Sequence, residues 1–180
     1  MDTILVIDAE ASGVGFQTFA VEGEGRLRRH ATGTIGVLGT YAHFTVDRAN
    51  GDVLANRVYP VEDVSDVAAA FEIVAAWLRN ELGIRPLAVG HRIVQTSHDY
   101  DRPLLIDSVV MSHLERLATL GLLHQSNSIE PIRQFMASDP ALPQVACFAM
   151  ADDHNMIARH ALALLLSQPS DQMPPSDQSS

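Results

Sequence analysis

The chain has 180 residues and a formal net charge of −10, and 47% of its residues are hydrophobic. This length fits a single domain with a sizeable apolar core. The excess of acidic residues argues against non-specific binding to nucleic acid and against docking on an anionic membrane surface, so we expect neither kind of partner.

Three further features predict a soluble cytoplasmic protein. A single cysteine, Cys147, excludes an internal disulfide and fits a reducing compartment. Because Cys147 lies in an apolar run, we expect a buried structural thiol and not a nucleophile. The first residues carry Asp2 and Asp8 and no basic segment, so no signal peptide is evident. No apolar stretch is long enough to span a bilayer.

The first part of the chain is predicted to consist mainly of strands. Residues 4–7 (ILVI) are β-branched or apolar and predict a buried strand that ends at Asp8. Gly13 and Gly15 then indicate a turn. Further extended segments are expected over 16–21, 26–47 and 53–59, with hairpin loops at 22–25 and at Asn50-Gly51.

Helices and strands are predicted to alternate in the rest of the chain. Ser65 is the expected N-cap of a first helix, whose apolar residues recur at helical spacing as far as Gly83, the expected C-cap. A strand follows over 86–94, and Asp107 is expected to cap a second helix. Further helices are expected near 129–137 and 156–166, and a further strand over 144–148.

This order of elements predicts one domain over residues 1–166, followed by a disordered tail over 167–180 made mainly of Ser, Gln, Pro and Asp. Antiparallel-type strands followed by alternating helices and strands indicate an α/β fold with a mixed sheet flanked by helices. This arrangement matches one half of a ribonuclease-H-like fold. The order alone leaves flavodoxin-like arrangements open.

The pair His91-Arg92 is the most informative feature of the sequence. It closes the apolar run 87–90 and precedes a polar stretch over 95–100. Ligands of open α/β sheets bind outside the carboxyl ends of the strands. The planar guanidinium of an arginine in that place suits a carboxylate or a phosphate. The alternative is an arginine that is merely solvated at the end of a strand.

Several segments, in chain order and correctly spaced, resemble motifs of the acetate and propionate kinases. Residues 90–94 (GHRIV) resemble the strand GHR(V/I)VHGG of that family. The matches together run from about residue 3 to residue 148, which is less than half of a typical family member. The other matching segments are 5–12 (LVIDAEAS), 103–107 (PLLID), 114–125 (LERLA followed by LLHQ) and 142–148 (LPQVACF).

The resemblance implies an actin-like phosphotransferase with a ribonuclease-H-like fold. Such an enzyme transfers the γ-phosphoryl group of Mg-ATP to acetate or propionate and forms an acyl phosphate. Arg92 would bind the substrate carboxylate and the transferring group, because two anions must be brought together. His124 would donate a hydrogen bond to the phosphoryl oxygens; without the resemblance it would be an ordinary loop histidine. Asp8 stands where the family has Asn and could bind magnesium as a hard oxygen ligand.

Two motifs depart from the family pattern. In the turn that contacts phosphate, two hydroxyls and the lysine of G-S-S-S-x-K are missing, and Glu10 adds a negative charge that should oppose ATP binding. At the strand end that carries the family's catalytic aspartate, the corresponding residue is Ala149, with Asp152 and Asp153 nearby. Both departures predict weak activity.

The extent of the resemblance predicts an N-terminal domain that acts with a second-domain chain or in a homodimer. Three interpretations stay open: an acetate kinase homologue with weak or lost activity, a non-catalytic domain that binds a small carboxylate, an acyl phosphate or a protein partner through Arg92, and a truncated product without a selected role. His154 and His160 are tied to no motif and are expected to be surface residues of a helix.

Overall fold

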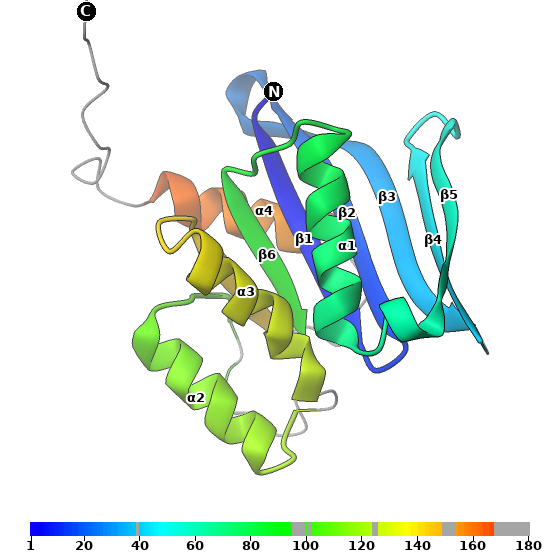
Figure 1. Ribbon diagram of the computed structural model, residues 1–180. Helices are drawn as coiled ribbons and strands as arrows, with labels where there is room; N and C mark the ends of the chain where they lie inside the picture. The colour runs from blue at the N-terminus through cyan, green and yellow to red at the C-terminus, as the bar shows by residue number, and fades with distance from the viewer. Residues whose placement is uncertain (39, 95–99, 101, 124–125, 149–153, 168–180) are drawn as a thin grey trace, which may run out of the picture.

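The computed structural model describes residues 1–38, 40–94, 100, 102–123, 126–148 and 154–167. Within these residues the chain forms an eight-stranded mixed sheet with helices on both faces (Figure 1). The strands are β1 (Thr3–Glu10), β2 (Gly13–Glu22), β3 (Arg26–Leu38), β4 (Tyr41–Arg48), β5 (Val53–Pro60), β6 (Ala88–Ile93), β7 (Leu104–Leu105) and β8 (Gln144–Phe148). The helices are α1 (Val67–Asn80), α2 (Ser108–Thr119), α3 (Glu130–Ser138) and α4 (His154–Leu166), and 3₁₀ turns occur at Gly23–Gly25, Val61–Asp63 and Ser126–Ile129.

The strand order is β5-β4-β3-β2-β1-β6-β8-β7. The first five strands form an antiparallel meander, whereas β6 pairs with β1 in parallel and β8 pairs with β6 in parallel. The predicted α/β fold with a mixed sheet is therefore confirmed. Because β1 and β6 are parallel neighbours, their carboxyl ends meet at one edge of the sheet, where ligands bind in open α/β sheets.

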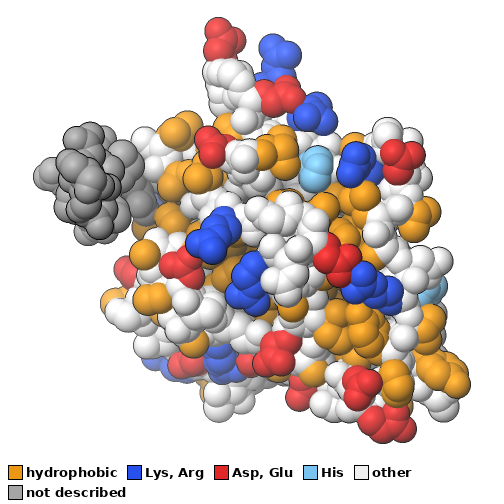
Figure 2. Space-filling view, turned by 45° about the horizontal axis from the view of Figure 1, so that its top comes forward, with side chains coloured by type: hydrophobic (Ala, Val, Ile, Leu, Met, Phe, Trp, Pro, Cys, Tyr) orange, Lys and Arg blue, Asp and Glu red, His pale blue; other side chains and the backbone are white. Residues whose placement is uncertain are grey.

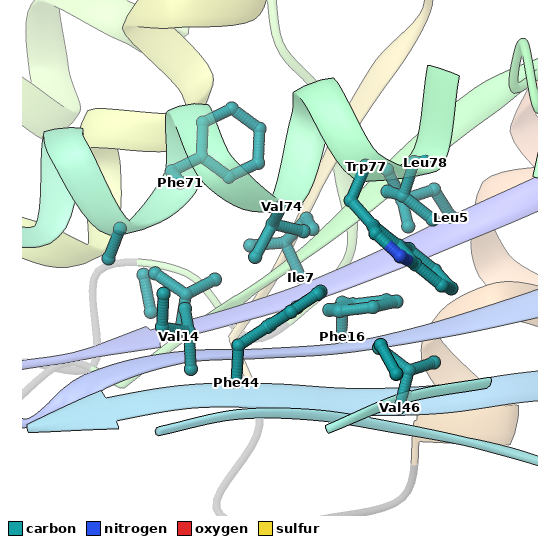
Figure 3. Close-up of a cluster of buried hydrophobic side chains, with 14 of the residues drawn as sticks. Leu5, Ile7, Val14, Phe16, Phe44, Val46, Phe71, Val74, Trp77 and Leu78 are labelled. Carbon is teal, nitrogen blue, oxygen red and sulfur yellow. The ribbon is translucent and has the colours of Figure 1, made fainter. Parts of the chain in front are cut away.

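Helix α1 covers one face of the meander over an aromatic core (Figure 3). The ring centroids of Phe44 and Trp77 lie 5.6 Å apart in an edge-to-face arrangement, and Phe16 lies 6.5 Å from Phe44. Gly33 on β3 makes room for these rings, since a Cβ there would lie 2.4 Å from Cζ of Phe16. The alternating apolar residues of β1, β2 and β4 thus meet the apolar stripe of α1.

Helix α4 packs on the opposite face, over β1 and β6. Gly90 lets it approach closely, because a Cβ at that position would lie 2.6 Å from Cγ2 of Ile157. The contact places the first turn of α4 near the carboxyl ends of β1 and β6. This close packing brings His154, the first residue of α4, to the candidate site.

The helix caps test two of the sequence predictions. Asp107 caps α2 as predicted, with Oδ1 accepting from the backbone N–H of Val110 at 2.8 Å. The predicted cap of α1 is wrong by one residue: Asp66, not Ser65, is the N-cap, and its carboxylate accepts from the N–H of Ala69 at 2.8 Å. The carboxylate also suits the positive end of the helix dipole, which a serine does not exploit.

Several boundaries differ from the sequence-based expectations. The extended segment expected over 26–47 is two strands, β3 and β4, paired antiparallel. Helix α4 begins at His154, two residues before the expected start, and the short strand β7 was not expected. The predicted disordered tail lies almost wholly outside the described residues, so that prediction stays untested.

The surface shows no single dominant charge on the face drawn in Figure 2, where acidic and arginine side chains are scattered among apolar ones. The net charge of −10 is therefore not gathered into one broad patch on that face. In the described part of the chain, no helix combines the length and the apolar character needed to cross a membrane.

Candidate functional site

The carboxyl ends of β1 and β6 bring charged side chains together. Ile7 pairs with His91 in parallel register, so the next residue of each strand, Asp8 and Arg92, are neighbours. Alternation along the strands places the side chains of Asp8, Glu10 and Arg92 on the face that carries α4. Two residues predicted from sequence, Asp8 and Arg92, thus meet at the predicted edge of the sheet.

Arg92 is occupied by carboxylates of its own chain. Its Nη1 lies 3.2 Å from Oδ1 and 3.2 Å from Oδ2 of Asp8, and donates to both. The same nitrogen lies 3.7 Å from Oε1 of Glu10. The side chains of Arg92 and Asp8 are only 12% and 14% exposed, whereas Glu10 is 53% exposed. Asp8 is therefore the tightly held partner, and Glu10 is free to turn toward water.

His154 lies on the other side of Asp8. Its Nε2 is 3.7 Å from Oδ2 of Asp8, and its Nδ1 lies 3.1 Å from the side-chain nitrogen of Gln17 on β2. The expectation that His154 is a surface residue is wrong, because its side chain is only 19% exposed and faces the cluster. No signal in the sequence indicates this placement, which depends on how closely α4 packs on Gly90.

The charge state of Asp8 follows from these neighbours. Burial raises the pKa of Asp8, but the N–H of His154 and the charge of Arg92 outweigh it, and the pKa lies below its ordinary value. Asp8 is thus ionised at neutral pH. The cluster then contains two carboxylates and one guanidinium.

A cavity of about 300 Å³ adjoins Asp8 on the side of the β1–β2 turn. Gly15 of β2 pairs with Asp8 and also lines the cavity, where the absence of a side chain leaves space. Gly13 has a φ of +154° and lies against the carbonyl oxygen of Ile35, where a Cβ would be only 2.0 Å away, so only glycine fits. The described residues that line this cavity include Asp8, Glu10 and His154 and no arginine.

His91, the other half of the sequence pair, points to the opposite face of the sheet. Its Nε2 lies 2.8 Å from the side-chain oxygen of Gln144 in a fully buried position. Burial lowers the pKa of His91 to about 4, against a smaller opposing effect of the hydrogen bond to Gln144. His91 is therefore a neutral core residue and takes no part in the charged cluster.

Of the other residues singled out in the sequence, Cys147 lies within the described part of the chain. Cys147 is buried as expected, and burial raises its pKa to about 12. His124 lies outside the described residues, as do Ala149, Asp152 and Asp153. Within the described residues, no three His, Cys, Asp or Glu side chains gather in a way that could hold a metal ion. The roles predicted for His124 and for Asp8 as a metal ligand stay predictions.

Comparison with known proteins gives a consistent result. The acetokinase family matches residues 3–171 of this chain. The chain is 50% identical over 151 residues to the acetate kinase of Nitrobacter hamburgensis, which covers 84% of this chain and 37% of that protein. It is 39% identical over 160 residues to the acetate kinase of Rhizobium meliloti, covering 89% of this chain and 40% of that protein.

Solved structures support the fold. A propionate kinase from Francisella tularensis superposes with a TM-score of 0.63 at 24% identity, over 82% of this chain and 37% of that one. The acetate kinase of Porphyromonas gingivalis superposes with a TM-score of 0.63 at 19% identity, over 89% of this chain and 43% of that one. The ribonuclease-H-like fold is thereby confirmed. The chain spans only about two fifths of the length of these relatives.

Proposed function

Since this chain belongs to the acetokinase family, we propose that it takes part in phosphoryl transfer between ATP and a short-chain carboxylate, acetate or propionate, with an acyl phosphate as the product. The chain spans about two fifths of its relatives, so the proposal leaves part of the substrate contacts to a second domain. That domain would lie on the same polypeptide, on a separate chain or in a second copy. A cytoplasmic location is part of the same proposal.

The pairing of Arg92 with Asp8 is the observation that carries this proposal. Nη1 of Arg92 lies 3.2 Å from both oxygens of a carboxylate, in a position that is 12% exposed. One guanidinium nitrogen thus already holds a carboxylate, which here belongs to a side chain of the same protein. A short carboxylate substrate needs the same contacts, and Arg92 lies at the edge of the sheet where ligands bind.

In the proposed reaction, a carboxylate oxygen attacks the γ-phosphorus of ATP and the bond from that phosphorus to the bridging oxygen of ADP breaks. The products are an acyl phosphate and ADP, so atoms and charges balance. Arg92 binds the attacking carboxylate and offsets the repulsion between two anions, which is the main barrier to their approach. His124, outside the described residues, is the proposed hydrogen-bond donor to the phosphoryl oxygens.

The residues described here do not fit a bound magnesium ion. Asp8 is the proposed ligand, but both of its oxygens face Nη1 of Arg92. In the part of the chain that the structure describes, no cluster of metal-ligating side chains surrounds it. A cation next to a guanidinium would be repelled. The proposed roles of Arg92 and His124 therefore do not depend on a magnesium ion bound at Asp8.

The cavity beside the β1–β2 turn predicts weak activity for the chain by itself. Its described lining carries the carboxylates of Asp8 and Glu10 beside His154 and no arginine, so negative charge faces the phosphates of ATP and opposes their binding. The same charges favour a second candidate function, a non-catalytic domain that binds a small carboxylate, an acyl phosphate or a carboxylate-bearing protein partner at Arg92. This candidate needs no nucleotide.

The test of the first candidate is acyl phosphate formation from Mg-ATP and acetate, trapped with hydroxylamine. We expect slow turnover that Arg92→Ala abolishes. Arg57→Ala is the matched control, since Arg57 pairs with Glu81 on the other face of the sheet. No product, together with no nucleotide-dependent shift of the melting temperature, would overturn the proposal.

Titration with acetate or propionate in the absence of nucleotide tests the second candidate. Saturable binding that needs Arg92 but not ATP would support it. Binding seen only in the presence of ATP would favour the kinase, because the second anion would then be part of the site.

A further inference from the structure

Asp8 has Arg92 close by on one side and the N–H of His154, at a longer distance, on the other. Nη1 of Arg92 donates to both of its oxygens at 3.2 Å. Nε2 of His154 lies 3.7 Å from Oδ2, beyond hydrogen-bond distance. This Nε2 is shut off from solvent and makes no hydrogen bond to the described residues. A buried donor held at this distance from a carboxylate gains only part of the available interaction, and a closer approach would complete it.

Gln17 on the Nδ1 side and the Asp8 carboxylate on the Nε2 side together favour one tautomer of His154. The side-chain nitrogen of Gln17 lies 3.1 Å from Nδ1 of His154. An amide nitrogen can only donate, so Nδ1 accepts. The proton of the neutral ring is therefore on Nε2 and points toward Asp8.

The histidine is also fixed in position. It lies in the first turn of α4, and α4 is held against β6 by the contact of Ile157 with Gly90. Asp8 lies near the carboxyl end of β1, opposite Gly15 of β2, and directly follows Ile7, which pairs with His91 of β6. The two side chains therefore face each other from rigid elements, and a small rotation of the Asp8 carboxylate can close the gap.

We propose that Asp8 exchanges partners when a ligand carboxylate binds: the ligand displaces Asp8 from Arg92, and Asp8 takes the N–H of His154 that Gln17 holds in place. This inference rests on the proposed function in one respect, namely that Arg92 binds the ligand carboxylate. His154 and Gln17 become positioning residues, and Asp8 sets the affinity of the site.

Burial explains why Asp8 needs a second partner. Its side chain is 14% exposed and meets water only at the edge of the cavity beside the β1–β2 turn, so hydration alone replaces little of the interaction with Arg92. An ionised carboxylate without a partner in such a place is strongly unfavourable. Glu10 does not share this constraint, because its side chain is 53% exposed and water can replace Arg92. Exchange onto His154 thus lowers the cost of ligand binding.

The experiment is a double-mutant cycle on residues 8 and 154, with the dissociation constant of isotopically labelled acetate measured by NMR. Asp8→Asn removes the competing charge and is expected to tighten binding about tenfold, the scale of one charge-assisted hydrogen bond. His154→Phe is expected to weaken binding about tenfold when Asp8 is present, and to have no effect in the Asp8→Asn background.

Two further variants separate exchange from a structural effect. His154→Gln keeps an N–H donor and is expected to restore binding, while His160→Phe, on the same helix, is the matched control and should change nothing. In the parent protein, long-range ¹H–¹⁵N spectra should show His154 protonated on Nε2, with that proton signal shifting as acetate is added. Melting temperatures check that every variant is folded.

The outcomes distinguish this inference from the proposed function. Binding that depends on Arg92 but shows additive effects at 8 and 154 would overturn the exchange and leave the proposed function standing. Non-additive effects of the two substitutions in a protein that forms no acyl phosphate would support the exchange of partners and overturn the proposed kinase activity. Absence of acetate binding in every variant, Asp8→Asn included, would overturn both.

Discussion

Ile157 of α4 lies directly on Gly90 of β6, so closely that a Cβ on residue 90 would come within 2.6 Å of Cγ2 of Ile157. The backbone of residue 90 has no unusual conformation that would require glycine; the requirement is one of space. The contact determines the distance of α4 from the sheet, and with it the position of His154 relative to Asp8.

Replacing Gly90 with alanine should therefore destabilise the protein. The added methyl group overpacks the interface with α4, and we expect a loss of about 1–3 kcal/mol in the free energy of unfolding, measured by urea denaturation. Gly23→Ala is the control, since nothing lies within 4 Å of a Cβ at that position. Equal stability of the two variants would contradict the close packing of α4.

The buried charges at the site predict a stability difference between single and double variants. Arg92→Ala leaves the 14% exposed carboxylate of Asp8 with the N–H of His154 in place of its guanidinium, which should cost about 1–3 kcal/mol. Adding Asp8→Asn removes the poorly compensated charge and should recover part of that loss. Urea denaturation of the two variants measures the difference; a double variant less stable than Arg92→Ala would show that Asp8 is not held by its charge.

Buried His91 predicts a loss of stability in mild acid. Burial lowers its pKa in the folded state to about 4, below the value of about 6.5 of an unfolded chain, so between these two pH values the unfolded chain binds more protons. The stability that the neutral ring contributes is complete above pH 6.5 and is lost as the pH falls toward 4, by about 3 kcal/mol in total.

The measurement is urea denaturation of the parent and of His91→Gln at several pH values between 7.5 and 4. We expect the parent to lose stability more steeply with falling pH than the variant. His43→Gln serves as the control. His43 lies on β4 and hydrogen-bonds the side chain of Asn56 on β5. Parallel curves for the parent and His91→Gln would contradict a neutral buried His91.

Cys147 should be inert in the folded protein. Burial raises the pKa of its thiol to about 12, so almost no thiolate exists at pH 8 and reagents cannot reach it. We expect no reaction with a chromogenic disulfide reagent in buffer, and complete reaction in denaturing urea. Rapid modification in buffer would mean that β8 opens locally.

The sequence identifies Asp8 and Arg92 of the charged cluster, because each follows an apolar run with a local pattern, but it does not show how they come together. The apolar runs before Asp8 and Arg92 indicate strands by their local pattern, and each charged residue is visible at the end of its run. That β6 pairs with β1 in parallel at this register is not visible in either run, and the structure shows it. The pairing then brings together Asp8 and Arg92, which are 84 residues apart.

His154 and Gln17 could not be predicted in the same way. Gln17 is one polar residue in an alternating strand, and its face becomes informative only when α4 is known to cover it. His154 depends on the approach of a helix to a glycine in another strand, a distance that no local pattern encodes. The shift of the α1 cap from Ser65 to Asp66 is a smaller case, since both residue types cap helices well.

The position of β1 in the middle of the sheet has a consequence for how the protein folds. Strands β1 to β5 are joined by hairpins and can assemble from local contacts, while the opposite edge of β1 stays unpaired until β6 docks on it in parallel. Closing that long loop is slow compared with hairpin formation. The arginine site is therefore complete only once β6 has docked on β1, and a chain that stopped at the meander would expose the edge of β1 to aggregation and bind no carboxylate.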